Sequence, residues 1–170
     1  MDESKNKEIL NQLLMDMEDF AKLKNIDYPP IYLLGGSGCI LSGYLTRATT
    51  DIDILDMDYD ARAGRLLRIL DRYDMLDIYL TTIPMDFEKR VLRLDGFKNL
   101  FVLSREDIIL SKLGRYSPID IEDISKLIGH SDKKLVGALI QSVITRKNIS
   151  TRVKNVFMEN VKNFKERFDV

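Results

Sequence analysis

Cysteine, histidine and tryptophan are almost absent from this chain of 170 residues, which has one Cys, one His and no Trp. A single cysteine, Cys39, excludes an internal disulfide. With His130 as the only histidine, the chain has neither a Cys/His cluster for zinc nor a Ser-His-Asp arrangement for acyl transfer. Oxygen ligands remain, and these are the ligands that Mg²⁺ and Mn²⁺ prefer.

Long apolar runs are also absent, so the sequence predicts no membrane-spanning helix and no membrane partner. The first seven residues are too polar for a secretory signal, and we therefore expect a cytoplasmic protein. Aromatic residues make up only 8% of the chain, which leaves Leu, Ile, Val and Met to fill the core. The net charge is −1, yet residues 131–170 hold nine Lys or Arg and four Asp or Glu. This basic end either follows a phosphate backbone or is a solvated helix face.

A glycine turn followed by two acidic residues is the most informative feature that is present. Gly35, Gly36 and Ser37 come directly after a short apolar run, and Asp51 and Asp53 follow a gap of thirteen residues. Side chains alternate between the two faces of a strand, so both aspartates should point away from the core. Neighbouring like charges repel each other, and a bound cation relieves that repulsion. The alternative is a purely structural turn next to a solvated strand face.

This spacing resembles the signature of the DNA polymerase β-type nucleotidyltransferase superfamily. In that signature a glycine turn precedes an Asp-hydrophobic-Asp strand by about a dozen residues, and a third carboxylate lies on a later strand. Asp77, with apolar neighbours in the segment 75–80, is the matching acid. The resemblance implies Mg²⁺ or Mn²⁺ at Asp51, Asp53 and Asp77, and a nucleotide at Gly35, Gly36 and Ser37.

A second stretch is similar to small prokaryotic nucleotidyltransferases akin to abortive-infection-type toxins. Those relatives pair a helix-borne lysine with a downstream aspartate near the nucleotide, which implies Lys112 with Asp120 or Asp123. Helical periodicity independently places Lys112 in an apolar stripe, where its ammonium needs an anionic partner unless it reaches solvent. Asp120 has an alternative role, since with Ser117 it fits a capping box at a helix start.

The hydrophobic periodicity predicts an α/β (α+β) fold, with a nucleotidyltransferase-like mixed sheet flanked by helices and a C-terminal helical segment packed against it. We expect a core at 1–104 and a helical region at 105–170. The predicted strands are 31–34, 51–55, 75–82 and 100–103. The predicted helices are 4–24, 37–45, 61–73 and 87–94, followed by helices from 105 onward with breaks near 117–118, 129–130 and 148.

The function that follows is an Mg²⁺-dependent nucleotidyltransferase that moves a nucleoside monophosphate from a nucleoside triphosphate to a hydroxyl of RNA or protein. A toxin-like role with an antitoxin partner is implied only by the resemblance. The alternative is a catalytically inactive nucleotide-binding or partner-binding module of the same fold. Arg47 either meets the triphosphate or acceptor or is a surface arginine. The catalytic residues expected are Asp51, Asp53, Asp77, Lys112 and Asp120, with Lys112 and Asp123 also at the nucleotide.

Overall fold

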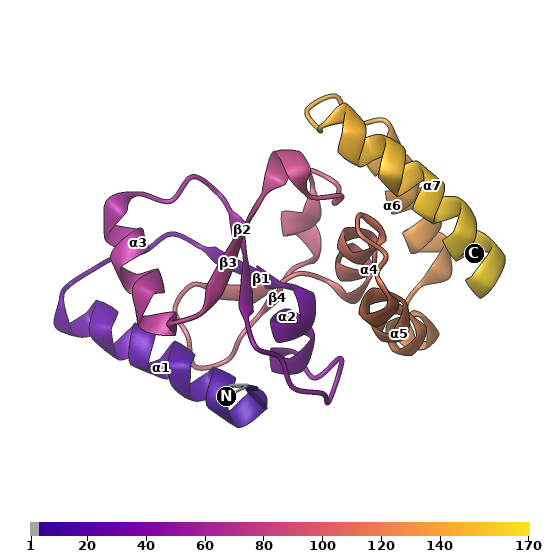
Figure 1. Cartoon of the computed structure of the whole chain (residues 1–170). Helices are drawn as coiled ribbons and strands as arrows, with labels where there is room; N and C mark the ends of the chain where they lie inside the picture. Colours follow the sequence, from indigo (N-terminus) through magenta and orange to yellow (C-terminus); the bar gives the residue numbers. More distant parts are fainter. Residues whose placement is uncertain (1–3) are drawn as a thin grey trace. The chain divides into compact units, whose positions relative to one another are not determined.

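The computed structural model describes residues 4–170, so the first three residues of the polar start and of the expected core 1–104 lie outside it. The fold is α+β (Figure 1), with a five-stranded sheet in the order β3-β2-β1-β5-β4. β1 is antiparallel to β2 and parallel to β5, and β5 is antiparallel to β4, so the predicted mixed sheet is confirmed. The strands are β1 (Ile31–Leu34), β2 (Ile52–Asp56), β3 (Tyr73–Asp77), β4 (Leu92–Arg93) and β5 (Leu100–Val102).

Contacts divide the chain into two compact units. The first extends through Leu76 and includes Leu92–Val102, and the second consists of Asp77–Val91 and Leu103–Val170. The segment Asp77–Val91 therefore groups with the C-terminal helices, and the division into a core 1–104 and a helical region 105–170 stays a prediction. The candidate acids Asp51 and Asp53 belong to the first unit.

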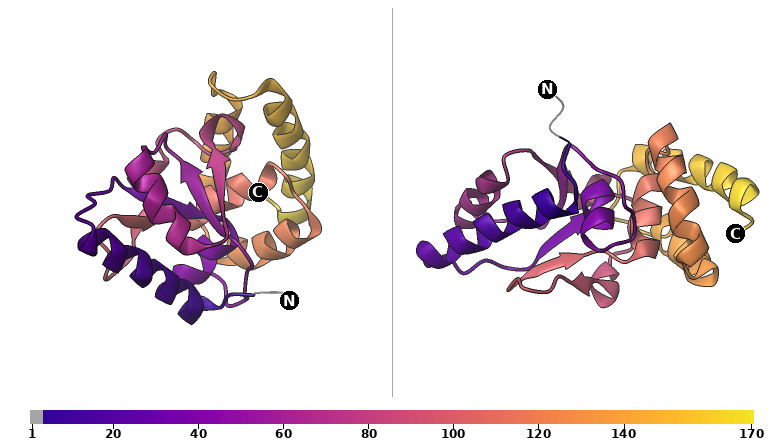
Figure 2. Two further views of the ribbon diagram at one scale, coloured as in Figure 1. Left: turned by 60° about the vertical axis from the view of Figure 1, so that its left-hand side comes forward. Right: turned by 90° about the horizontal axis from the view of Figure 1, so that it is seen from below.

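Helices α1 (Lys7–Leu23), α2 (Gly35–Leu41) and α3 (Ala61–Leu67) belong to the first unit, and α3 continues into the 3₁₀ turn η1 (Arg68–Leu70). α1 packs beside α2 and α3, as Figures 1 and 2 show. Its buried face includes Leu10, Leu14 and Met17, which recur at helical spacing and have no exposed surface. All four residues of β1 are buried, which explains their continuous apolar sequence.

The second unit contains α4 (Arg105–Leu113), α5 (Pro118–Leu127), α6 (Lys133–Ile144) and α7 (Thr151–Phe168). α4 contacts each of the other three helices. Every one of these helices has a side-chain N-cap, and the caps are Ser104, Ser117, Asp132 and Ser150. The expected breaks near 117–118, 129–130 and 148 are therefore confirmed. Over residues 4–170, no helix is both long enough and apolar enough to cross a bilayer.

Four predicted elements differ from the structure. The helix 61–73 ends at Leu70 as α3 and η1, and Tyr73 already belongs to β3. The strand 75–82 was wrong beyond Asp77, because the Asp77 side chain accepts a hydrogen bond from the backbone of Tyr79 and starts the 3₁₀ turn η2 (Ile78–Leu80). The helix 87–94 is instead the 3₁₀ turn η3 (Phe87–Arg90) followed by β4. The helix expected at 37–45 begins two residues earlier, at Gly35, and ends at Leu41.

Candidate functional site

The strand β2 has the expected alternation around its first aspartate. Ile52 and Ile54 have no exposed surface, whereas Asp53 between them is partly exposed. Asp51 lies one residue before β2 and is also partly exposed. Both carboxylates are thus directed away from the face that Ile52 and Ile54 bury, as the period of two requires.

The carboxylate of Asp53 lies directly against Gly35. A Cβ atom added to Gly35 would lie 1.9 Å from Asp53 Oδ2 and 2.8 Å from its carboxyl carbon. Gly35 also has a φ of +64°, a conformation that residues with a Cβ seldom adopt. Glycine is therefore required here for two reasons, the backbone conformation and the space that the Asp53 carboxylate occupies.

The next glycine has a comparable contact with a cation. A Cβ atom on Gly36 would lie 2.6 Å from Nη2 of Arg47 and 3.2 Å from the central guanidinium carbon. Arg47 Nη1 also donates a hydrogen bond to the carbonyl of Ala48 at 2.9 Å. The two consecutive glycines thus have a carboxylate packed against one and a guanidinium packed against the other.

Ser37 fixes the backbone of Asp53. Its hydroxyl has no exposed surface, donates to the carbonyl of Leu34 at 3.2 Å and accepts from the backbone N–H of Asp53 at 3.0 Å. Its hydrogen is used within the protein, and it makes no N-cap bond to α2. We weighed phosphate binding against helix capping for Ser37, and the structure shows a third arrangement, in which Ser37 connects the end of β1 to β2.

Asp51 has a cation of its own. Its Oδ1 lies 3.3 Å from Nε of Arg72, and its Oδ2 accepts a hydrogen bond from the Thr50 hydroxyl at 3.3 Å. Arg72 comes directly before β3, and its carbonyl accepts from the backbone N–H of Ile52. Asp51 is therefore held at the junction of two neighbouring strands.

Between residues 4 and 170, no three His, Cys, Asp or Glu side chains form a group that would hold a metal ion by themselves. Mg²⁺ normally binds proteins through one or two carboxylates and completes its shell with water and substrate phosphates. The partly exposed carboxylates of Asp51 and Asp53 provide oxygen donors of this kind. The donor chemistry fits Mg²⁺ or Mn²⁺ that arrives with a triphosphate.

Asp77 is the last residue of β3 and the first residue of the second unit. Its Oδ1 accepts from the backbone N–H of Tyr79 at 2.7 Å, and its carbonyl accepts from the Thr81 hydroxyl at 2.7 Å. The side chain is exposed. Asp77 therefore has a structural role as the cap of η2, and a catalytic role is still a prediction.

Lys112 is buried and paired, as the helical periodicity required. The residue is 7% exposed, and its ammonium lies 2.8 Å from Asp123 Oδ2 and 3.5 Å from Asp120 Oδ1. The expected anionic partners are thus the two aspartates named from the sequence, and the snorkelling alternative does not apply. Whether the pair contacts a nucleotide is a separate prediction.

Asp120 connects this buried pair to the surface. Arg115 binds it through a two-pronged contact, with Nε 2.8 Å from Oδ2 and Nη2 2.9 Å from Oδ1. Ser117 donates to it from both its hydroxyl and its backbone N–H, and completes the capping box expected from the sequence. Burial alone raises the pKa of Asp120, but the hydrogen bonds from Arg115 and Ser117 and the charge of Lys112 outweigh it, so the pKa lies below its ordinary value.

Sequence reasoning left three arginines out of the expected site, and one of them, Arg72, was not named at all. Arg47 was weighed and left open, although it is the only charged residue between Ser37 and Asp51, which is a usable signal. Arg115 was missed because it follows the end of α4, where helical periodicity gives no indication of direction.

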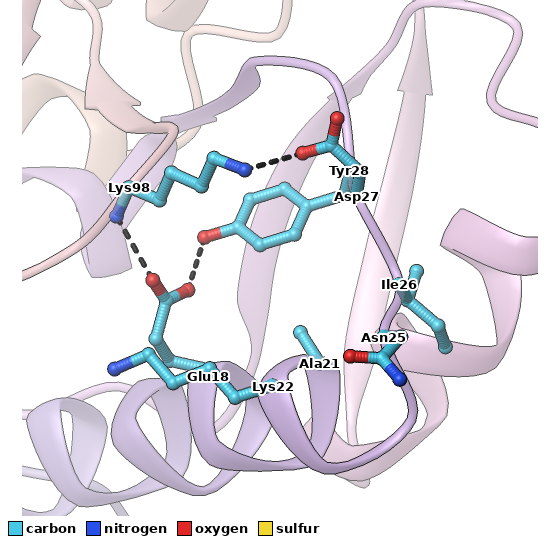
Figure 3. Close-up of a pocket in the computed structure, with 8 residues that line it drawn as sticks. All are labelled: Glu18, Ala21, Lys22, Asn25, Ile26, Asp27, Tyr28 and Lys98. Carbon is cyan, nitrogen blue, oxygen red and sulfur yellow. Dashed lines mark hydrogen bonds and ion pairs between the residues drawn. The ribbon is translucent and has the colours of Figure 1, made fainter.

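A separate cavity of about 650 Å³ lies beside the C-terminal half of α1 and the loop that precedes β1 (Figure 3). Its most buried polar side chain is Glu18, which accepts from the Tyr28 hydroxyl and, at 3.0 Å, from the backbone N–H of Lys98. The ammonium of Lys98 pairs with Asp27. Burial, followed by the hydrogen bond to Glu18, raises the pKa of Tyr28.

These interactions pair Glu18, Tyr28, Asp27 and Lys98 with one another within the protein itself. The loop that lines it enters β1, whereas Gly35 follows the other end of that strand. The cavity therefore belongs to the packing of α1 and is not part of the glycine and aspartate arrangement.

A family model described as "Nucleotidyltransferase of unknown function (DUF6036)" matches residues 8–168 of the chain. Neither the curated proteins nor the solved structures gave a match. The match covers the glycine turn, both candidate acids of the first unit and the whole helical part.

Proposed function

The chain belongs to this family of nucleotidyltransferases, and from that premise we propose that it transfers a nucleoside monophosphate from a nucleoside triphosphate to an acceptor hydroxyl. The acceptor oxygen forms a bond to the α-phosphorus while the bond from that phosphorus to the β-phosphate bridging oxygen breaks. Pyrophosphate leaves, and the hydroxyl proton passes to a carboxylate. The fit of Asp53 against Gly35 is the observation that carries this proposal.

That fit supports a built site over an accidental pair of acids. An aspartate on a solvated strand face needs no glycine beneath it, yet Gly35 leaves the space that the Asp53 carboxylate fills. Ser37 fixes the backbone N–H of the same aspartate. Catalytic groups need such support, because small displacements of a reacting group reduce the rate strongly.

Asp51 and Asp53 are the residues that would hold Mg²⁺ or Mn²⁺. When bound there, the ion would neutralise charge on the triphosphate and on the oxygens of an in-line displacement. Arg72 holds Asp51 at the start of β2. Arg47, from the loop before β2, packs against Gly36 and is suited to a phosphate oxygen.

The residues of the second unit have supporting roles in the proposal. Lys112 and Asp123 are proposed to contribute to the nucleotide site through their buried pair, and Asp120 to hold that pair against Arg115 and Ser117. Asp77 is proposed to receive the acceptor proton. A toxin-like component with an antitoxin partner is the biological setting that the sequence resemblance favours.

Asp53→Ala tests the proposal. We expect transfer of label from an α-³²P nucleoside triphosphate, in the presence of Mg²⁺ and total RNA or lysate protein, to fall by about 10³-fold, because metal-assisted charge stabilisation contributes several kcal/mol. Nuclease or protease treatment of the product distinguishes an RNA acceptor from a protein one. Asp56→Ala, at the other end of β2, is the matched control and should retain activity.

Full transfer by Asp53→Ala would refute the proposal. Calorimetry on the wild-type chain provides a second criterion. Nucleotide binding without any release of pyrophosphate, with every acceptor class present, would indicate the inactive binding module instead.

A further inference from the structure

The 3₁₀ turn that follows Asp77 exposes two large apolar side chains. Tyr79 is 53% exposed and Leu80 is 50% exposed, and Met85, a few residues later, is 49% exposed. Large apolar groups are common on protein surfaces one at a time, but three within seven residues, one of them aromatic, suggest a contact surface.

The backbone of this turn is held rigidly by a buried arginine. Arg146 is 6% exposed, and its guanidinium donates to the carbonyls of Ile78 at 3.0 Å, Thr81 at 2.8 Å and Ile83 at 2.8 Å. It forms no ion pair with any residue between 4 and 170. Burying a cation whose hydrogen-bond acceptors are all neutral costs free energy. The bonds from Arg146 to the three carbonyls hold the backbone of the turn in one conformation.

Tyr79 itself is fixed at both its backbone groups. Its N–H donates to Asp77 at 2.7 Å, and its carbonyl accepts from the backbone N–H of Ser150 at 3.0 Å. An aromatic ring on a support that is already ordered loses little conformational entropy when a ligand stacks on it. The exposed ring of Tyr79 is therefore attached to an ordered backbone and does not lie at the tip of a flexible loop.

The segment that touches this turn is strongly basic. Residues 146–158 include four Lys or Arg and no Asp or Glu. Arg146 and Ser150 of this segment bond to the turn, and Asn148 contacts Met85. Lys147 and Arg152 are exposed, and neither forms an ion pair within the described residues. Two exposed cations therefore lie directly after Arg146 or within two residues of Ser150, whose backbone N–H bonds to Tyr79.

We propose that residues 78–83, together with Lys147 and Arg152, bind single-stranded nucleic acid, with a base stacked on Tyr79 and phosphates at the two cations. A stacking ring beside unpaired cations is the combination that such strands require, because every base has a face to stack and every link has a negative charge. Its role rests on the proposed function: the strand is the acceptor, and Asp77, two residues before Tyr79, is the carboxylate nearest to it along the chain.

Fluorescence anisotropy with the full chain and a labelled 12-nucleotide oligo(U) tests this surface. Tyr79→Ala should weaken binding about 10-fold, because stacking of one base contributes this order of affinity, and Tyr79→Phe should restore it. The double variant Lys147→Gln/Arg152→Gln should reduce the slope of log K against log salt by about 1.4, from about 0.7 for each phosphate contact on a single strand. Lys134→Gln/Lys165→Gln removes the same charge from exposed positions elsewhere and should leave binding unchanged.

Four results would contradict the proposed nucleic-acid-binding surface. These are no binding to the single strand, equal binding by Tyr79→Ala and wild type, equal losses in the two double variants, or transfer of label to protein only. Asp53→Ala keeps this surface intact and should bind oligo(U) like the wild type. Loss of transfer with binding retained supports both proposals, whereas transfer by Asp53→Ala with oligo(U) binding retained removes the catalytic proposal alone.

Discussion

At the scale of single residues, Gly35 and Gly96 show two structural reasons for a glycine, which are a positive φ and space for a neighbouring side chain. Both have a positive φ, +64° and +87°, but nothing lies within 4 Å of a Cβ placed on Gly96, whereas the Asp53 carboxylate occupies that place at Gly35. A residue with a Cβ would therefore strain the backbone at both positions, but it would collide with a candidate functional side chain only at Gly35.

Gly35→Ala should displace Asp53 as well as strain the backbone. Urea unfolding should show a loss of about 1 kcal/mol for Gly96→Ala, from the positive φ alone, and an additional loss of about 1–3 kcal/mol for Gly35→Ala, from overpacking. Nucleotide transfer should be lost in Gly35→Ala and kept in Gly96→Ala. Equal stability losses with equal activities would contradict the packing of Asp53 against Gly35.

The sequence was a good guide to residue types at this site and a poor guide to their partners. The spacing of Gly35 and Asp53 indicated a shared site, because strand alternation and turn glycines leave a readable pattern. The hydrogen bonds of Ser37 to Leu34 and Asp53 were not readable, because a hydroxyl serves phosphates, caps and distant backbone groups equally well. Only the fold determines which of these partners is present.

At the scale of elements, the buried contact between α4 and α5 is a charged one. Asp123 has no exposed surface, and the Lys112 ammonium lies 2.8 Å from it. This contact was predictable, since a lysine within an apolar helix stripe requires an anion. The end of β3 was not predictable, because a single bond from the Tyr79 N–H to Asp77 replaces a strand that the apolar alternation favoured.

Lys112→Met should destabilise the fold by about 3–5 kcal/mol, because it leaves Asp123 buried without its cation. Lys112→Met/Asp123→Leu removes both charges and should recover a large part of that loss. Denaturant unfolding of the two single variants and the double variant measures the coupling between the residues. Additive losses would show that the two side chains do not depend on each other.

At the scale of the whole molecule, the pKa of Asp120 makes the free energy of unfolding depend on pH. Because the folded-state pKa is below the ordinary value of 3.8, Asp120 contributes stability at pH values above about 3.8. That contribution is lost as the pH falls through the lower folded-state pKa. The other side chains that titrate in this range also contribute, so a variant is needed to isolate this one.

Asp120→Asn should therefore be less stable than the wild type at neutral pH, and the difference in unfolding free energy should shrink as the pH falls below about 3.8. Thermal or urea unfolding between pH 7 and pH 2 measures this difference. Asp74→Asn, which removes an exposed carboxylate of β3, is the control for loss of charge. A difference that stays constant down to pH 2 would contradict the lowered pKa.

The class of the fold followed from the sequence, whereas the contacts that group distant segments into compact units were not readable from it. Alternating strands and helices predicted the mixed sheet and the helical C-terminal part. The grouping of Asp77–Val91 with that part depends on contacts such as those of Arg146 with Thr81 and Ile83. These bonds join residues more than 60 positions apart, and no local pattern reports them.

The two outer strands of the sheet have a consequence for how copies of the chain behave in a crowded solution. β4 has only two residues, and β3 has exposed acids at Asp74 and Asp77 before it ends in a turn. Short or charged edge strands offer little unpaired backbone with which a strand of another molecule could pair. Both edges of the sheet are therefore poor templates for the addition of strands from other copies of the chain.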